Sequence, residues 1–356
     1  MGNHRRSASG AGRRTGGAES RVVDMIRSRR LPRRFFLLAT AALLLTACAA
    51  GGGASVSTSP SRDAASASTA PDRAGPVDIG GREIYLECHG SGSPTVILVS
   101  GLGDGADVWS TPASGALPSP GPSSSASDPA SPTVYSDVAA FTRVCAYDRP
   151  GTAGSRSGDV PQPTSAQTSA DDLEKLLRAS GEVGPFVLVG HSYGGPIVRL
   201  FASDHPDQVS GLVLVDALSE DLDAGLTPAQ RTLFAELNAP PPTPGAEYFE
   251  MTTLVTELRE SPPAPDVPVI VLTADIPQLT PEVLASGQLP PGVDQEFADA
   301  LWAAQLAAQD ELAARFPEAV HVTQPRSDHY IQLGNPQLVI DSIREVVDDA
   351  ARAGRG

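Results

Sequence analysis

Short apolar runs alternate with longer amphipathic stretches through the larger part of this chain, residues 76–350. The largely apolar runs are 94–99, 141–147, 186–189, 211–216, 267–272 and 319–322. Such runs are typical of strands buried on both faces of a parallel sheet, and an alternating run at 82–88 predicts an earlier strand. The stretches with helical spacing are 171–179, 295–316 and 335–350. Strands that alternate with helices predict an α/β fold with a mostly parallel central sheet flanked by helices.

The run 186–189 leads directly into Gly190-His191-Ser192-Tyr193-Gly194, and a helical pattern follows with Pro196 in its first turn. Gly-x-Ser-x-Gly between a buried strand and a helix is the pattern of a nucleophile elbow, in which glycines let the flanking segments pass closely. The turn presents the Ser192 hydroxyl at a helix N-terminus, where free N–H groups favour developing negative charge. We therefore predict that Ser192 is a nucleophile.

The N-terminal region has the pattern of an export signal. An apolar run of thirteen residues at 35–47 is too short to span a bilayer, and Arg33-Arg34 precedes it as in twin-arginine signals. Leu45-Thr46-Ala47-Cys48 resembles a bacterial lipobox, so we expect removal of residues 1–47 and lipidation of Cys48. The alternative is an ordinary secretory signal, and Met1 and Met25 are both candidate starts. The expected location is the outer face of the cell membrane, as a lipoprotein, or outside the cell if the protein is secreted.

Two segments have a composition that cannot bury a core. Residues 48–75 are mostly Gly, Ala, Ser, Thr and Pro, which predicts a flexible tether between a lipid anchor and a folded domain at 76–350. Residues 112–132 have a similar composition without periodicity, which predicts a disordered insertion.

Charge separates the leader from the rest of the chain. The first 47 residues carry ten arginines and two acids, net +8, while the whole chain carries −16, which leaves −24 for the remainder. An acidic mature chain argues against nucleic acid and against anionic membrane as partners, so the lipid at Cys48 is the only membrane contact we expect. We find no metal-ligand spacing and no phosphate-binding loop, so we expect no cofactor and no metal. The oligomeric state is left open.

These features together resemble the α/β-hydrolase family, and the resemblance covers roughly residues 76–350. Ser100-Gly101-Leu102-Gly103 stands where many members have His-Gly after a central strand, so Ser100 departs from the pattern. The resemblance implies an oxyanion hole built from the backbone N–H groups of Leu102 and Tyr193. It also implies that Asp148 and Arg149, in the turn after the next strand, are structural.

The family order of nucleophile, acid and histidine implies a base near the C-terminus. Among the six histidines, His329 lies in the loop after the last predicted strand, with Asp328 in place of the usual glycine, whereas His321 lies within that strand. Two carboxylates compete as the triad acid. Asp216 ends one strand and Asp275 follows the next, and we favour Asp216 while keeping Asp275 as the alternative.

The resemblance implies a serine hydrolase that cleaves an ester or related acyl bond of a small, apolar substrate through an acyl-enzyme. Residues 217–266 would form a cap over the site, and Trp109 is a candidate wall of the substrate pocket. The apolar side chains of the cap either line an acyl pocket or pack the cap onto the core. The alternative functions are a non-catalytic surface lipoprotein that binds a small ligand, and an acyltransferase.

The remaining cysteines, Cys88 and Cys145, lie on two predicted strands that the family places side by side. A disulfide between them and a pair of buried thiols are both compatible with the sequence.

Overall fold

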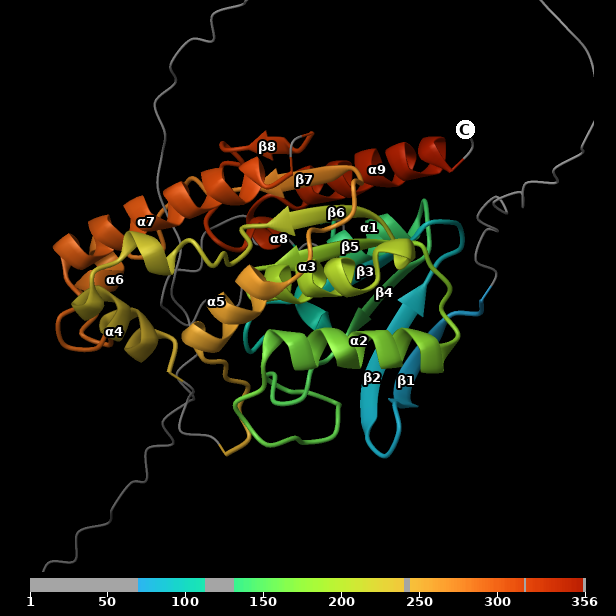
Figure 1. Cartoon of the computed structure of the whole chain (residues 1–356), viewed down its shortest axis with the longest axis horizontal. Coiled ribbons are helices and arrows are strands. Elements are labelled where there is room, and N and C mark those ends of the chain that lie inside the picture. Colours follow the sequence, from blue (N-terminus) through green and yellow to red (C-terminus); the bar gives the residue numbers. More distant parts are fainter. Residues whose placement is uncertain (1–69, 113–130, 240–243, 317, 355–356) are drawn as a thin grey trace, which may run out of the picture.

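The computed structural model describes residues 70–112, 131–239, 244–316 and 318–354. The predicted signal, Cys48, the tether as far as residue 69, and residues 113–130 of the predicted insertion lie outside the described residues (Figure 1). Export and lipidation therefore stay predictions. Within the described ranges, no helix combines the length and the apolar character that crossing a membrane requires.

A sheet of eight strands forms the centre of the described domain (Figure 1). Its order is β1-β2-β4-β3-β5-β6-β7-β8; β2 pairs antiparallel with β1 and β4, and all the other pairs are parallel. This confirms the predicted α/β class with a mostly parallel sheet. The strands are β1 (Arg73–Asp78), β2 (Glu83–His89), β3 (Thr95–Val99), β4 (Val144–Tyr147), β5 (Phe186–His191), β6 (Val209–Val215), β7 (Val269–Leu272) and β8 (Val320–Val322).

Helices cover both faces of the sheet because its strands are apolar on both faces. In β5, Phe186 and Leu188 pack in one core cluster with α2 and α3, whereas Val187 and Val189 pack in a second cluster with α1 and α9. The helices are α1 (Val134–Ala139), α2 (Ala166–Ser180), α3 (Gly194–Asp204), α4 (Pro228–Leu237), α5 (Met251–Glu260), α6 (Pro281–Leu284), α7 (Gln295–Ala314), α8 (Ile331–Gly334) and α9 (Pro336–Ala353). Three 3₁₀ turns are η1 (Ala106–Ser110), η2 (Pro206–Gln208) and η3 (Asp223–Gly225).

The ordered domain begins earlier than residue 76, the predicted boundary. Strand β1 starts at Arg73 and forms an antiparallel hairpin with β2 at the edge of the sheet. Pro76 is tolerated in it because an edge strand leaves one side of its backbone unpaired. Ala70 and Pro71 lie just before β1, and their carbonyl groups accept hydrogen bonds from the buried Arg143 guanidinium. The same guanidinium pairs with Glu182. The start of the domain is thus held by a residue that is distant in sequence.

Cys88 on β2 and Cys145 on β4 are direct partners in the antiparallel register, and a disulfide joins them. Their Cα atoms are 4.1 Å apart, and both side chains are fully buried. The bridge ties the β1–β2 hairpin to the parallel part of the sheet. Of the two alternatives that the sequence left open, the structure contains the disulfide.

The predicted cap segment, 217–266, contains η3, α4 and α5, and it lies beyond the arrowhead of β6 in Figure 1. Helix α4 begins with a capping box, in which Thr227 and Gln230 satisfy each other's backbone N–H groups. Leu226, Phe234 and Phe249 belong to the main core cluster. These apolar residues therefore pack the cap onto the core.

Candidate active site

Ser192 lies in the sharp turn between β5 and α3. Its φ of 50° is in the left-handed region, which residues other than glycine rarely adopt. The Ser192 N–H donates to the Val215 carbonyl at 3.1 Å, and its own carbonyl accepts from the Gly195 N–H at 2.9 Å. A Cβ at Gly194 would lie 2.2 Å from the Val99 carbonyl oxygen, so only glycine allows α3 to begin this close to β3.

His329 and Asp216 form a buried pair. His329 follows β8 in the loop 323–330, and its Nδ1 lies 2.8 Å from Asp216 Oδ2. Asp216 follows β6 and is fully buried, while His329 is 8% exposed. The other Asp216 oxygen, Oδ1, accepts from the Ala274 N–H at 3.0 Å. An ionised carboxylate only accepts hydrogen bonds, so the His329 proton lies on Nδ1 and leaves Nε2 as an acceptor.

Backbone contacts bring the elbow next to this pair. The Leu218 N–H donates to the Ser192 carbonyl at 2.9 Å, so residues on both sides of Asp216 are bonded to Ser192. On the other side, His191 Nε2 donates to the His329 carbonyl at 3.1 Å, and the two imidazole rings are 4.6 Å apart. The structure therefore gathers the predicted nucleophile, base and acid at the carboxyl ends of β5, β6 and β8.

His191 supports the loop that carries His329. Burial lowers the pKa of His191 well below its usual range, so its imidazole is neutral and one nitrogen carries a proton. A Cβ at Gly101 would lie 2.9 Å from His191 Nδ1, so glycine is required there as well.

Trp109, the predicted pocket wall, is buried in the core. Its side chain is 1% exposed within η1 and belongs to the same core cluster as α9 residues, and its ring is nearly perpendicular to that of His191, with centroids 6.5 Å apart. Trp109 therefore neighbours His191, whose own ring lies 4.6 Å from that of His329.

Asp275, the alternative acid, is used elsewhere. Its Oδ1 accepts from the Ser327 N–H at 3.0 Å, and its own N–H donates to the Ser327 carbonyl at 3.0 Å. These bonds brace the loop two residues before His329. Of the two candidates, the structure places Asp216 at the imidazole.

One predicted oxyanion donor lies in the elbow and the other lies in the loop after β3. Tyr193 has helical backbone angles and caps α3, so its N–H belongs to the free first turn of that helix. Leu102 lies in the loop after β3 and packs partly buried against the main core cluster. The Tyr193 ring stacks on Phe249 of the cap, with centroids 4.5 Å apart. Cap, elbow and loop therefore meet around these two amides.

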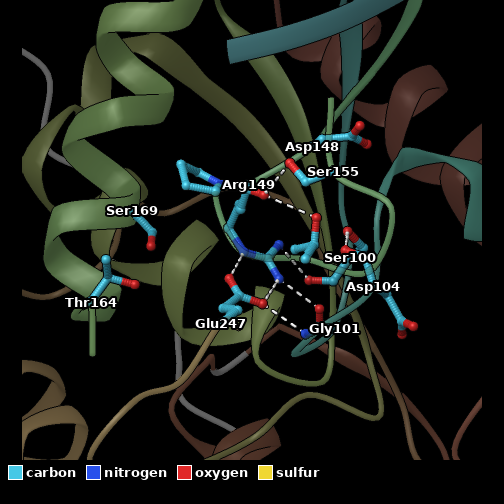
Figure 2. A network of polar contacts seen from close by, with 12 residues as sticks. Ser100, Gly101, Asp104, Asp148, Arg149, Ser155, Thr164, Ser169 and Glu247 are labelled. Carbon is cyan, nitrogen blue, oxygen red and sulfur yellow. Dashed lines mark hydrogen bonds and ion pairs between the residues drawn. The ribbon is translucent and has the colours of Figure 1, made fainter. Parts of the chain in front are cut away.

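A buried ion pair adjoins the same loop and was not predicted as part of the site. Arg149 donates from Nε and Nη2 to the Glu247 carboxylate at 2.6 and 3.0 Å (Figure 2). Sequence analysis assigned Arg149 a structural role and did not single out Glu247. Glu247 lies in an irregular segment between α4 and α5, where neither periodicity nor a motif distinguishes one acid from its neighbours.

Asp104 is a second titratable group near His329. Burial raises the pKa of its carboxyl to about 6, and the positive charges of His329 and Arg149 offset part of that shift. Its Oδ2 is buried without a hydrogen-bond partner. The folded protein therefore favours the neutral form of Asp104, and the cost of ionising it appears as pH rises through about 6.

We expect Asp104→Asn to increase the free energy of unfolding at neutral pH. Because the folded pKa lies above the unfolded one, the stabilising contribution of neutral Asp104 is complete below the unfolded pKa of 3.8 and is lost as pH rises through about 6. A shift of this size corresponds to on the order of 2–3 kcal/mol, and the amide removes that cost above the transition. Urea unfolding of both proteins across this pH range measures it. Asp107→Asn, which changes an exposed neighbour, is the control, and equal pH profiles for wild type and Asp104→Asn would contradict the prediction.

Within the described part of the chain, Cys88, Cys145 and Glu182 form the grouping whose donor atoms lie close enough for a metal ion. The two sulfurs are bonded to each other, and Glu182 pairs with Arg143. We assign no metal site to this grouping.

Comparison with known proteins identifies the fold. A family profile described as the alpha/beta hydrolase fold matches residues 94–263. An uncharacterised protein of Schizosaccharomyces pombe is 41% identical over 76 residues, 21% of this chain and 14% of that protein. RutD of Klebsiella pneumoniae (strain 342), named as a candidate carbamate hydrolase, is 32% identical over 125 residues, 35% of this chain and 38% of that protein. This chain spans less than half of the length of these curated relatives.

Among solved structures, the haloalkane dehalogenase DatA of Agrobacterium tumefaciens C58 superposes with a TM-score of 0.51 at 15% identity. The superposition covers 77% of this chain and 97% of DatA. At this identity the likeness concerns the fold alone. The sheet order, the elbow at Ser192 and the family profile agree, and the described domain has the α/β-hydrolase fold.

Proposed function

We propose that this protein is a serine hydrolase that cleaves an ester or related acyl bond of a small, apolar substrate. The observation that carries the proposal is the buried His329–Asp216 pair, 2.8 Å from nitrogen to oxygen, held beside the strained Ser192 turn. A protein that only binds a ligand has no need of a serine, a histidine and an acid in this order. The resemblance of part of the chain to RutD is compatible with the proposal, because a carbamate is also an acyl compound.

In the proposed mechanism, Ser192 Oγ attacks the substrate carbonyl while His329 Nε2 accepts the hydroxyl proton. Asp216 keeps the imidazole in the tautomer with its proton on Nδ1, so that Nε2 can act as the base, and it stabilises the imidazolium that forms. The N–H groups of Leu102 and Tyr193 stabilise the oxyanion of the tetrahedral intermediate. His329 then returns the proton to the leaving group, and water hydrolyses the acyl-enzyme by the same steps. Dehalogenation and epoxide opening through an aspartyl ester are disfavoured, because the nucleophile position holds a serine.

A fluorophosphonate is expected to react with Ser192 and to inactivate the protein. The reagent phosphonylates a serine that a neighbouring base activates, and the phosphonyl oxygen occupies the place of the oxyanion. Mass spectrometry of proteolytic peptides identifies the modified residue. Hydrolysis of p-nitrophenyl esters of increasing chain length, measured on the same preparation, then reports the size of the acyl group.

Ser192→Ala should take up no reagent and show no burst of p-nitrophenol, while Ser110→Ala, which alters an exposed serine, should react like the wild type. An adduct on a different serine would reject Ser192 as the nucleophile. Absence of both labelling and ester hydrolysis in the folded wild type would reject the hydrolase proposal.

A further inference from the structure

The ion pair of Arg149 and Glu247 contacts the loop 100–104, which contains Leu102. Figure 2 shows both side chains directed at this loop. Resting on the proposed function, we propose that Glu247, a residue of the cap, acts through Arg149 and Gly103 as a positioning residue that sets the oxyanion hole. The hole would then be complete only while the cap segment is docked. The contacts on each side of Leu102 support this proposal.

On the N-terminal side of Leu102, Arg149 binds two successive carbonyl groups. Its Nη1 donates to the Ser100 carbonyl at 2.8 Å, and its Nη2 donates to the Gly101 carbonyl at 2.6 Å. The carbonyl of Gly101 and the N–H of Leu102 belong to one peptide unit, and in a trans peptide these two groups point in opposite directions. Arg149 therefore directs the Leu102 N–H away from itself. Its positive charge also polarises this peptide and strengthens the N–H as a donor.

On the C-terminal side, the next peptide is fixed by Glu247. The Gly103 N–H donates to Glu247 Oε2 at 2.7 Å, and the Gly103 carbonyl accepts from the Ala153 N–H at 2.7 Å. Leu102 is thus held between two peptides whose orientations are both set by charged or backbone partners. The loop has φ of +76° at Gly103, a conformation that glycine adopts freely, so these bonds are what select one arrangement.

Glu247 is itself firmly placed by the cap segment. Its N–H donates to the Gly151 carbonyl at 2.8 Å, and the Tyr248 N–H donates to the Gln162 side chain at 3.1 Å. A Cβ at Gly151 would lie 2.5 Å from the Gly245 carbonyl, so the two segments are in close backbone contact. The carboxylate reaches the loop only because residues 245–248 lie against the turn after β4.

Stability alone is a weak reason for this pair. Both side chains are almost fully buried, at 3% and 1% exposure, and two charges removed from water recover little net free energy compared with apolar residues of the same volume. Burial opposes the charge of Arg149, but the attraction of Glu247 and the hydrogen bonds to it outweigh burial and raise the pKa of Arg149, so it stays charged. The bidentate pair instead confers a fixed direction on both partners.

The test separates oxyanion stabilisation from the Ser192–His329 couple. Glu247→Gln keeps the shape of the side chain but turns one acceptor into a donor, which then faces Arg149 or the Gly103 N–H. Arg149→Lys keeps the charge but cannot span two carbonyl groups and a carboxylate at once. Glu250→Gln, an exposed carboxylate in the same segment, is the matched control. Circular dichroism establishes whether each variant is folded. If Glu247→Gln does not fold, the kinetics of Arg149→Lys alone test the proposal.

For both variants we expect kcat for a p-nitrophenyl ester to fall by ~10–100-fold, which is less than the loss seen when an oxyanion donor is removed altogether. We expect KM to change by less than about threefold. The same substitutions are then placed in a Ser192→Cys protein, and the rate of alkylation by iodoacetamide is measured on the peptide that contains this position. Sulfur displaces iodide directly, so this reaction forms no oxyanion and depends on His329 only. Its rate should change by less than about twofold.

Unchanged kcat in a folded Glu247→Gln protein would overturn the inference, and so would equal losses of kcat and of alkylation rate, which indicate damage to the nucleophile and base. An increase of kcat in Glu247→Gln would show that the unpaired charge of Arg149, and not the placement of the loop, stabilises the oxyanion. If the folded wild type neither hydrolyses esters nor reacts with a fluorophosphonate, the proposed function fails and the inference fails with it.

Discussion

Asp216→Asn is expected to lower kcat for an ester substrate by about 10⁴-fold while the protein stays folded. The reason lies in the second partner of the carboxylate. The Ala274 N–H is a donor, so the amide oxygen of an asparagine would turn toward Ala274, and its NH₂ group would face His329 Nδ1. Nδ1 would then have to accept, which places the imidazole proton on Nε2. In that tautomer His329 cannot take the proton of Ser192. Steady-state kinetics across a range of pH measures the effect.

Asp275→Asn is the control for this prediction, because Asp275 is the other carboxylate that the sequence offers. Its Oδ1 accepts one hydrogen bond, from the Ser327 N–H, and an asparagine oxygen can accept the same bond. We therefore expect kcat within about tenfold of wild type, from a slight displacement of the His329 loop. A larger loss for Asp275→Asn than for Asp216→Asn would assign the triad acid to Asp275.

The strands that position the site could be predicted because their signal is local. Each central strand is a short apolar run, and the run 186–189 is followed by Gly190 and Gly194, the two glycines that the turn requires. The strand β1 could not be predicted in this way. Its residues, with Gly75 and Pro76 in the middle, have weak strand propensity, and pairing with β2 and the contacts of Arg143 hold it in place.

In the candidate site, too, the residues with a local sequence signal could be predicted and those placed by long-range contacts could not. Ser192, Asp216 and His329 each lie at or after the carboxyl end of a predicted strand, so the carboxyl edge of a parallel sheet brings them together, and their catalytic roles stay predictions. Glu247 lies 98 residues beyond its partner Arg149 in a segment without regular structure, and its place depends on how the cap docks. For Trp109 the same holds, since whether an apolar ring faces a pocket or the core depends on how η1 packs against the sheet, and its place at a pocket wall stays a prediction. Long-range packing of irregular segments is what residue patterns do not encode.

Loss of the Cys88–Cys145 disulfide is expected to lower the free energy of unfolding by about 4 kcal/mol, since the bridge closes a long loop and restricts the unfolded chain. The two residues are 57 positions apart, and the bridge joins the β1–β2 hairpin to β4. Urea unfolding of the oxidised and the reduced wild type compares the same side chains with and without the bond. Cys88→Ala combined with Cys145→Ala should resemble the reduced protein, less a further cost for the vacated core volume.

The location of the bridge predicts which part of the molecule responds first. Strand β2 is the antiparallel strand through which β1 is joined to the sheet, so reduction should raise amide hydrogen exchange in β1 and β2 more than in β5 and β6. Thiol titration of denatured, unreduced protein checks the bond itself. It should be done on Cys48→Ser, because Cys48 is the third cysteine of the chain. No reactive thiol is expected before reduction and two are expected after it. Two thiols before reduction would show that the hairpin is held by strand pairing and packing alone. The expected difference of about 4 kcal/mol would then vanish, because it comes from closure of the loop by the disulfide.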